Sequence, residues 1–140
     1  MRLDYKVEGG DFARAGWASS QVKKVLKQLG VDQNIVKRVV VALYEAEVNI
    51  VAHAYRGEIG VDIDAEKIVM RLEDEGPGIP DVSLAMQRGY STATPQVREM
   101  GFGAGMGLPN INTNADIFNI ETKVGVGTTL EIIINFKSNQ

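Results

Sequence analysis

The stretch 67-KIVMRLEDEGPGIP-80 changes character in its middle, and the prediction of the fold starts from that change. Its first half, Lys67–Glu73, alternates apolar and charged side chains, which is typical of a strand with one buried face. From Glu75 the alternation stops, and Gly76 and Gly78 follow within three residues. We therefore predict a strand that ends near Asp74 and leads into a loop whose backbone needs the freedom of glycine.

The rest of the chain places this strand among helices and further strands. The predicted elements, in chain order, are a strand at residues 2–8, a helix capped by Asp11 and ending at Leu29 before Gly30, a helix capped by Asp32 and ending near Tyr55, a hairpin of Gly60–Asp64 and Lys67–Glu73 that turns at Ala65–Glu66, a short helix at Val82–Gln87, a helix at Leu108–Asn114, and a closing hairpin of Ile117–Thr122 and Thr128–Phe136. This order predicts an α+β fold, a two-layer sandwich with helices on one face of a mixed, mainly antiparallel sheet.

Composition narrows the class of protein. The chain has 140 residues, which favours a single domain spanning residues 1–140. Its net charge of −3 argues against a nucleic-acid-binding protein, which needs a basic surface. It contains no cysteine, no apolar run long enough to span a membrane and no signal-peptide pattern. We expect a cytoplasmic protein without a membrane partner.

The glycine-rich segment does not match the common nucleotide-binding signatures. Seven of the fifteen glycines lie between Gly76 and Gly107, but the chain contains no Gly-Lys dipeptide and so no P-loop. In 101-GFGAGMGL-108 the glycines recur at every second residue, which differs from the dinucleotide fingerprint G-x-G-x-x-G. A single histidine without cysteine cannot form the usual zinc site, and no G-x-S-x-G elbow of a hydrolase occurs.

Four segments together resemble the GHKL, or Bergerat-fold, ATPase superfamily. The segment 45-EAEVNIVAHAY-55 is similar to its N-box, 74-DEGPGIP-80 to its D-x-G-x-G box, 101-GFGAGMGLPNI-111 to its second glycine box, and 125-GVGTTLEI-132 to its closing Gly-Thr strand. They occur in the family's order over about residues 35–135. The closest likeness is to the small anti-sigma and stressosome-switch serine kinases. The resemblance implies a Bergerat ATP-binding fold that uses ATP and Mg²⁺.

The N-box segment predicts the phosphate end of the site. Glu45 and Asn49 are four residues apart, so their side chains lie on one face of a helix, whereas Glu47 points away. An amide oxygen at Asn49 can ligate Mg²⁺, a cation that prefers oxygen. The carboxylate of Glu45 can act as the general base for a nucleophile that attacks the γ-phosphoryl group. His53 continues the same stripe, and we assign it a structural role, hydrogen-bonded near the helix end.

The D-x-G-x-G segment predicts the adenine end. An ionised Asp74 can accept a hydrogen bond from the adenine amino group, which favours adenine over guanine. We expect Gly76 and Gly78 to leave room for the base, and Pro77 to stiffen the turn. The other adenine-contacting candidates, which the resemblance implies, are Ile79 and the hydroxyl of Thr128 or Thr129; for the two threonines, ordinary strand propensity is an alternative explanation.

The segment from Arg88 to Gly107 corresponds to the ATP lid of the family. Its last glycines precede the helix at Leu108, so backbone N–H groups at the helix start can bind phosphate oxygens. The lid residues assigned to the nucleotide are Gly103, Gly105, Met106, Gly107 and Leu108. Related sporulation kinases carry an arginine ahead of Gly-Met-Gly, where this chain has Gly103 and Ala104; Arg98 is a candidate substitute.

These residues lead to three hypotheses. The first is a protein serine/threonine kinase that phosphorylates a small STAS-domain antagonist, an anti-anti-sigma-like protein, with a sigma factor as a further candidate partner. The second is a nucleotide-gated protein-binding module with little or no phosphotransfer. The third is the catalytic fragment of a sensor histidine kinase, which would need a separate helical domain for its phosphorylated histidine. The sequence does not decide whether the chain forms a homodimer.

Overall fold

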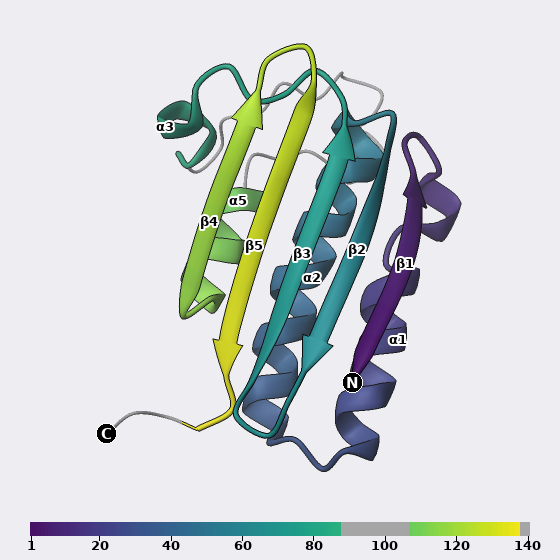
Figure 1. Cartoon of the computed structure of the whole chain (residues 1–140), viewed down its shortest axis with the longest axis vertical. Helices are drawn as coiled ribbons and strands as arrows, with labels where there is room; N and C mark the ends of the chain where they lie inside the picture. Colours follow the sequence, from purple (N-terminus) through teal and green to yellow (C-terminus); the bar gives the residue numbers. More distant parts are fainter. Residues whose placement is uncertain (88–106, 138–140) are drawn as a thin grey trace.

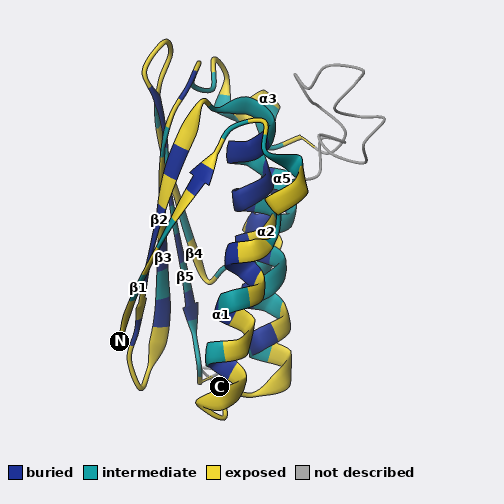
Figure 2. Cartoon of the chain, turned by 90° about the vertical axis from the view of Figure 1, so that its right-hand side faces the viewer, coloured by how far each residue is buried: buried dark blue, intermediate teal, exposed yellow. Residues whose placement is uncertain are grey.

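A computed structural model describes residues 1–87 and 107–137 of the chain. Five strands form one sheet in the order β1-β2-β3-β5-β4. Helices α1, α2 and α5 all cover one face of this sheet, and no described helix covers the other face (Figure 1, Figure 2). This is the α+β two-layer arrangement predicted from the order of elements.

The elements match the predicted ones in type, with shifted ends. Their bounds are β1 Arg2–Glu8, η1 Phe12–Arg14, α1 Trp17–Gln28, α2 Gln33–His53, β2 Arg56–Ile63, β3 Lys67–Glu75, α3 Val82–Ala85, α5 Gly107–Asn114, β4 Ile117–Lys123 and β5 Gly127–Asn135. The described strands pair only in antiparallel fashion, so the sheet is more regular than the expected mixed one. Among the described helices, none has the length and apolar character needed to cross a membrane.

The core lies between the sheet and the helices. Residues of β3 and β5 alternate, and their buried side chains face α2 and α5, as the pairs Ile68–Ile134 and Met70–Ile132 illustrate. Helix α2 contributes Val39, Leu43 and other apolar residues, which are fully buried. Because α2 runs along the middle of the sheet (Figure 1), it holds any residue on its sides in a fixed position relative to the strands.

Two predicted boundaries were wrong. Asp11 does not cap the first helix: a short 3₁₀ turn follows it, and α1 begins only after Gly16, whose φ of 92° breaks the helical path. Strand β2 begins at Arg56, four residues before the predicted Gly60, because Arg56–Ile59 pair with both β1 and β3. Three of these four residues are charged or glycine, so no alternation of apolar and polar residues indicates a strand. Pairing with the adjacent strands β1 and β3 places them in the sheet.

Candidate functional site

Helix α2 presents Glu45 and Asn49 together, as their spacing predicts. The helix starts where expected, because the Asp32 carboxylate accepts a hydrogen bond from the Asn34 backbone N–H at 2.8 Å. Glu45 and Asn49 are both partly exposed. Within residues 1–87 and 107–137, the Asn49 side chain makes no hydrogen bond. Its amide oxygen is therefore available to a ligand.

Glu45 faces the start of α5. The side-chain amide of Asn110 donates to Glu45 Oε1 over 3.4 Å, a long hydrogen bond. A Cβ atom added to Gly107 would lie 3.5 Å from Glu45 Oε2, so the first residue of α5 is adjacent to the carboxylate. Asn110 was not among the site residues predicted from the sequence. Its position three residues after Gly107, one helical turn along, is the signal that could have found it.

Glu47 points to the opposite side of α2, as predicted, but its role there was not foreseen. Its side chain is buried, with 2% of the residue exposed. It accepts hydrogen bonds from the backbone N–H groups of Gly16, Ala18 and Ser19, each 3.1 Å long, and from the Ser19 hydroxyl at 2.6 Å. Glu47 thus supplies the cap that α1 lacks within its own sequence. A helix that starts at a glycine without a capping side chain indicates such a distant acceptor.

Asp74 lies near the end of β3, and the Thr128 backbone N–H of β5 donates to its Oδ1 at 3.0 Å. Burial raises the pKa of this carboxyl, and the Thr128 hydrogen bond lowers it by a smaller amount. A partly buried carboxylate with one oxygen held by the backbone keeps acceptor capacity for a ligand. This placement suits the role predicted for Asp74.

The loop after Asp74 is hydrogen-bonded to the turn between β4 and β5. The Gly76 N–H donates to the Val126 carbonyl at 3.0 Å, and the Gly125 N–H donates to the Pro77 carbonyl at 2.9 Å. Gly78 has a φ of +76°, and a Cβ there would lie 2.6 Å from the Lys123 carbonyl oxygen. The close approach of the Lys123 backbone is a structural reason for glycine at position 78.

The two threonine candidates point to opposite faces of the sheet. Thr128 is buried on the helix-covered side, and its hydroxyl lies 2.9 Å from that of Thr122. Thr129 alternates to the open side, in line with Glu131. The structure therefore brings Thr128, and not the Thr129 side chain, to Asp74. Ile79 lies on the same side, and its N–H donates to the Thr122 hydroxyl at 2.8 Å.

The lid candidates are only partly described. Gly103, Gly105 and Met106, with Arg98 and Ala104, lie outside the described residues. Gly107 begins α5 next to Glu45, as noted above. The Leu108 side chain belongs to the hydrophobic core, with 7% of the residue exposed, so only its backbone could contact a nucleotide.

His53 is the last residue of α2 and continues the stripe of Glu45 and Asn49. Burial lowers the pKa of its imidazole, which favours the neutral form. Among the described residues it has no hydrogen-bond partner. The expected hydrogen bond near the helix end is thus not seen in this part of the chain.

The residues at the phosphate end fit Mg²⁺ held together with a nucleotide. Within residues 1–87 and 107–137, no three carboxylate or imidazole side chains gather as a metal site. An Asn49 oxygen would be one protein ligand, and phosphate and water oxygens would supply others. Mg²⁺ is commonly bound in this way in phosphoryl-transfer sites.

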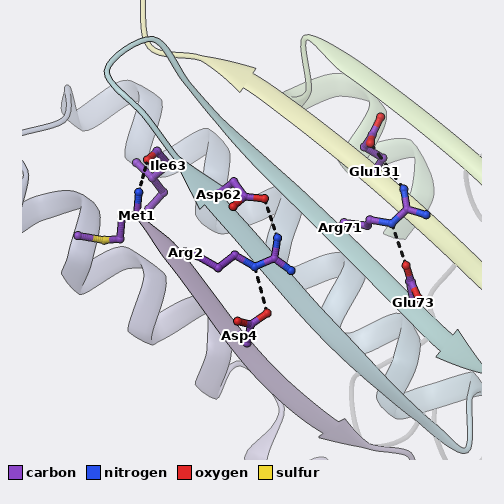
Figure 3. A network of polar contacts seen from close by, with 8 residues as sticks. All are labelled: Met1, Arg2, Asp4, Asp62, Ile63, Arg71, Glu73 and Glu131. Carbon is purple, nitrogen blue, oxygen red and sulfur yellow. Dashed lines mark hydrogen bonds and ion pairs between the residues drawn. The ribbon is translucent and has the colours of Figure 1, made fainter.

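A hollow of about 310 Å³ lies elsewhere, on the open face of the sheet over β1, β2 and β3. There Arg2 pairs with Asp4 and Asp62, and Arg71 pairs with Glu73, as Figure 3 shows. Arg2 and Arg71 are thus already paired with carboxylates, and such exposed ion pairs contribute little to stability. None of the predicted site residues lines this surface.

Comparisons with known proteins show which family this chain resembles. A model of the family described as histidine kinase-like ATPase domain matches residues 11–134. The serine/threonine-protein kinase RsbT of Bacillus subtilis is 32% identical over 115 residues, which cover 79% of this chain and 80% of that protein. An anti-sigma F factor of Clostridium kluyveri is 28% identical over 139 residues, covering 93% and 89%.

A solved structure shows the same fold. The structure of the RsbU and RsbW domains of Rv1364c from Mycobacterium tuberculosis superposes with a TM-score of 0.63 at 16% identity. The match covers 95% of this chain and 32% of that one. At this identity the likeness concerns the fold alone.

Proposed function

The chain belongs to the histidine kinase-like ATPase domain family, and from this premise we propose that it transfers the γ-phosphoryl group of Mg·ATP to a serine or threonine of a small STAS-domain protein. The family match confirms the membership of the ATPase family that the sequence motifs predicted. The class of activity, an ATP-dependent serine/threonine kinase of the anti-sigma type, agrees with the relatives named above. The STAS acceptor and the assignment of residues are our proposal.

One observation carries the proposal: Glu45 and Asn49 keep acceptor oxygens available on the face of α2 beside the first turn of α5. In the proposed step, the acceptor hydroxyl loses its proton to Glu45 while its oxygen forms a bond to the γ-phosphorus. The bond between that phosphorus and the bridging oxygen of ADP breaks, and ADP leaves with the electron pair. Glu45 then returns its proton to solvent.

Asn49 would hold Mg²⁺ through its side-chain oxygen, and Gly107 would offer its N–H at the start of α5 to phosphate oxygens. When bound, Mg²⁺ supplies neutralisation of the phosphate charge that develops during transfer. Asp74 would accept the adenine amino group, with Thr128 next to it. Of the assigned lid residues, Gly103, Gly105 and Met106 would complete the phosphate contacts.

A second candidate function is a nucleotide-gated binding module. It is favoured by Gly103 and Ala104, which stand where related kinases carry an arginine. Without a cation at that point, charge on the transferred phosphoryl group would be less stabilised. ATP binding would persist, but transfer would be slow.

Partners follow from the relatives and remain part of the proposal. An anti-anti-sigma-like STAS protein would be the substrate, and a sigma factor would be a second partner; a homodimer is compatible with both. We propose the cytoplasm as the compartment, in keeping with the absence of cysteine.

The test is incubation of the purified chain with γ-labelled ATP, Mg²⁺ and STAS proteins encoded near its gene. Label on a serine or threonine of one STAS protein supports the kinase. If the chain binds ATP and a STAS protein but transfers no label, the binding-module function replaces it. Omission of Mg²⁺ and a STAS variant with alanine at the acceptor are the controls.

A further inference from the structure

The hydroxyl of Thr122 lies at the centre of the predicted adenine end, although no sequence motif singled it out. Its Oγ1 accepts a hydrogen bond from the Ile79 N–H at 2.8 Å. It lies 2.9 Å from Thr128 Oγ1 and 3.3 Å from the Gly127 carbonyl oxygen. Thr122 and Thr128 are directly opposite each other in the β4–β5 ladder, so their side chains share one face.

These contacts close a ring around the loop of residues 74–79. Asp74 is held by the Thr128 N–H at 3.0 Å. The Thr128 hydroxyl contacts Thr122, Thr122 holds the Ile79 N–H, and the chain from Ile79 back to Asp74 completes the circuit. The Thr122 hydroxyl therefore adds a side-chain link between the D-x-G-x-G loop and Thr128, the residue that holds Asp74.

The number of protons limits the hydrogen bonds that the two threonine hydroxyls can make. A threonine hydroxyl has one proton to donate and two lone pairs to accept with. Thr122 already accepts from Ile79, and its one proton can go either to the Gly127 carbonyl oxygen, at 3.3 Å, or to the Thr128 hydroxyl, at 2.9 Å. When Thr122 donates to Thr128, the Thr128 proton is free to point at a ligand.

We propose that Thr122 is a positioning residue for base selection: it directs the Thr128 hydroxyl to act as a donor beside the acceptor Asp74. The inference rests on the proposed ATP site and deepens it. A donor next to an acceptor matches the edge of adenine, where the N6 amino group donates and the neighbouring ring nitrogen accepts. Guanine presents the opposite order, an acceptor at O6 and a donor beside it.

The experiment compares Mg·ATP and Mg·GTP binding by calorimetry in the whole chain. Thr122→Val, which keeps the shape and removes the hydroxyl, should weaken ATP binding about 2- to 10-fold, the equivalent of one neutral hydrogen bond. GTP binding should change less, so the preference for ATP falls. Thr122→Ser keeps the hydroxyl and should keep the wild-type preference. Thr113→Val, which removes a helix hydroxyl bonded to Pro109, is the matched control and should leave both affinities unchanged.

The outcomes separate the two levels of the proposal. Equal weakening of ATP and GTP in Thr122→Val would mean a purely structural role, and unchanged affinities would mean no role; either result overturns the inference while ATP binding by the wild type stands. A wild type that binds no Mg·ATP would overturn the proposed function and the inference with it. If Thr122→Val does not fold, the pair Thr122→Ser and Thr122→Ala gives the same comparison of hydroxyl present and absent.

Discussion

The two sides of helix α2 use the same residue type in opposite ways. On the side that faces α1, Glu47 is buried, and four donors occupy its oxygens. On the side that faces α5, Glu45 is partly exposed, and among the described residues it has one long contact, to Asn110. Asn49 lies on this second side.

In our proposal, this difference separates a structural carboxylate, Glu47, from a catalytic one, Glu45. Glu47 has used its acceptor capacity to satisfy the start of α1, so its contribution is to stability. Glu45 and Asn49 keep acceptor capacity beside the first turn of α5, which is where a nucleotide phosphate would gain from the helix N-terminus. Substitutions on the two sides should therefore affect different measurements.

The largest effect is expected for Glu45→Ala in the phosphotransfer assay. Removal of a general base typically lowers the rate by about 10²- to 10⁴-fold. Mg·ATP affinity and thermal stability should stay near those of wild type, since Glu45 is not needed to bind the nucleotide or to hold α1. Equal transfer rates in variant and wild type would make Glu45 part of the scaffold and erase the contrast with Glu47.

Asn49→Ala should remove the Mg²⁺-dependent part of ATP binding, because it deletes a proposed metal ligand from the exposed side of α2. Calorimetric titration of ATP with and without Mg²⁺ measures this part. The melting temperature serves as the control, since Asn49 makes no hydrogen bond to a described residue. A variant with wild-type Mg²⁺ dependence would rule out this ligand.

Asp74→Asn extends the comparison to the adenine end. The amide can present a donor where the carboxylate only accepts, so ATP binding should weaken and the preference over GTP should fall. Loss of one charged hydrogen bond costs about 1.5–3 kcal/mol, or roughly 10- to 150-fold in affinity. Titrations with ATP and with GTP measure both affinities. Unchanged affinities in the variant would mean that Asp74 does not contact the base.

The same variant should not destabilise the ligand-free fold at neutral pH. Burial raises the pKa of Asp74 above its ordinary value of 3.8, so its contribution to stability is fully present below that value and is lost as pH rises through the raised pKa. The neutral amide of the Asp74→Asn variant avoids this loss, and its oxygen can still accept from the Thr128 N–H. Thermal melts at pH 7 and pH 3.5 measure the difference; a clear loss at pH 7 would contradict the sign.

Glu47→Ala should lower the free energy of unfolding by about 1–3 kcal/mol, because buried donors at the start of α1 lose their acceptor. Urea denaturation gives the value, and Glu45→Ala on the same helix is the matched control. Glu47→Gln keeps one acceptor oxygen, so its free energy of unfolding should lie between those of Glu47→Ala and Glu45→Ala. ATP affinity of the folded fraction should be unaffected; a large change there would show that the two sides of α2 are coupled.

The smallest effect concerns His53, the only histidine of the chain. Burial lowers its pKa below the ordinary 6.5, so its contribution to stability is present above pH 6.5 and is lost as pH falls toward the lowered pKa. His53→Gln should reduce the stability difference between pH 7.5 and pH 5.5. Identical pH dependence in variant and wild type would mean that the imidazole is protonated as easily in the fold as in the unfolded chain.

The sequence predicted most of the elements and the pairing of Glu45 with Asn49, because periodicity and i, i+4 spacing are local properties. It did not predict the cap of α1 by Glu47, which joins residues 28 to 31 positions apart, nor the link between Thr122 and Ile79. Both depend on how α2 packs on α1 and how β4 meets the loop of residues 76–79. The choice between Thr128 and Thr129 likewise required the register of β5.

A crystal structure of the chain with Mg²⁺ and a non-hydrolysable ATP analogue tests the central claim most directly. We predict the adenine amino group within hydrogen-bond distance of the Asp74 carboxylate and the Asn49 side-chain oxygen on the metal, with Glu45 beside the γ-phosphate. A nucleotide bound elsewhere, for example in the hollow over β1, β2 and β3, or one held without contact to Asp74 and Asn49, would contradict the account.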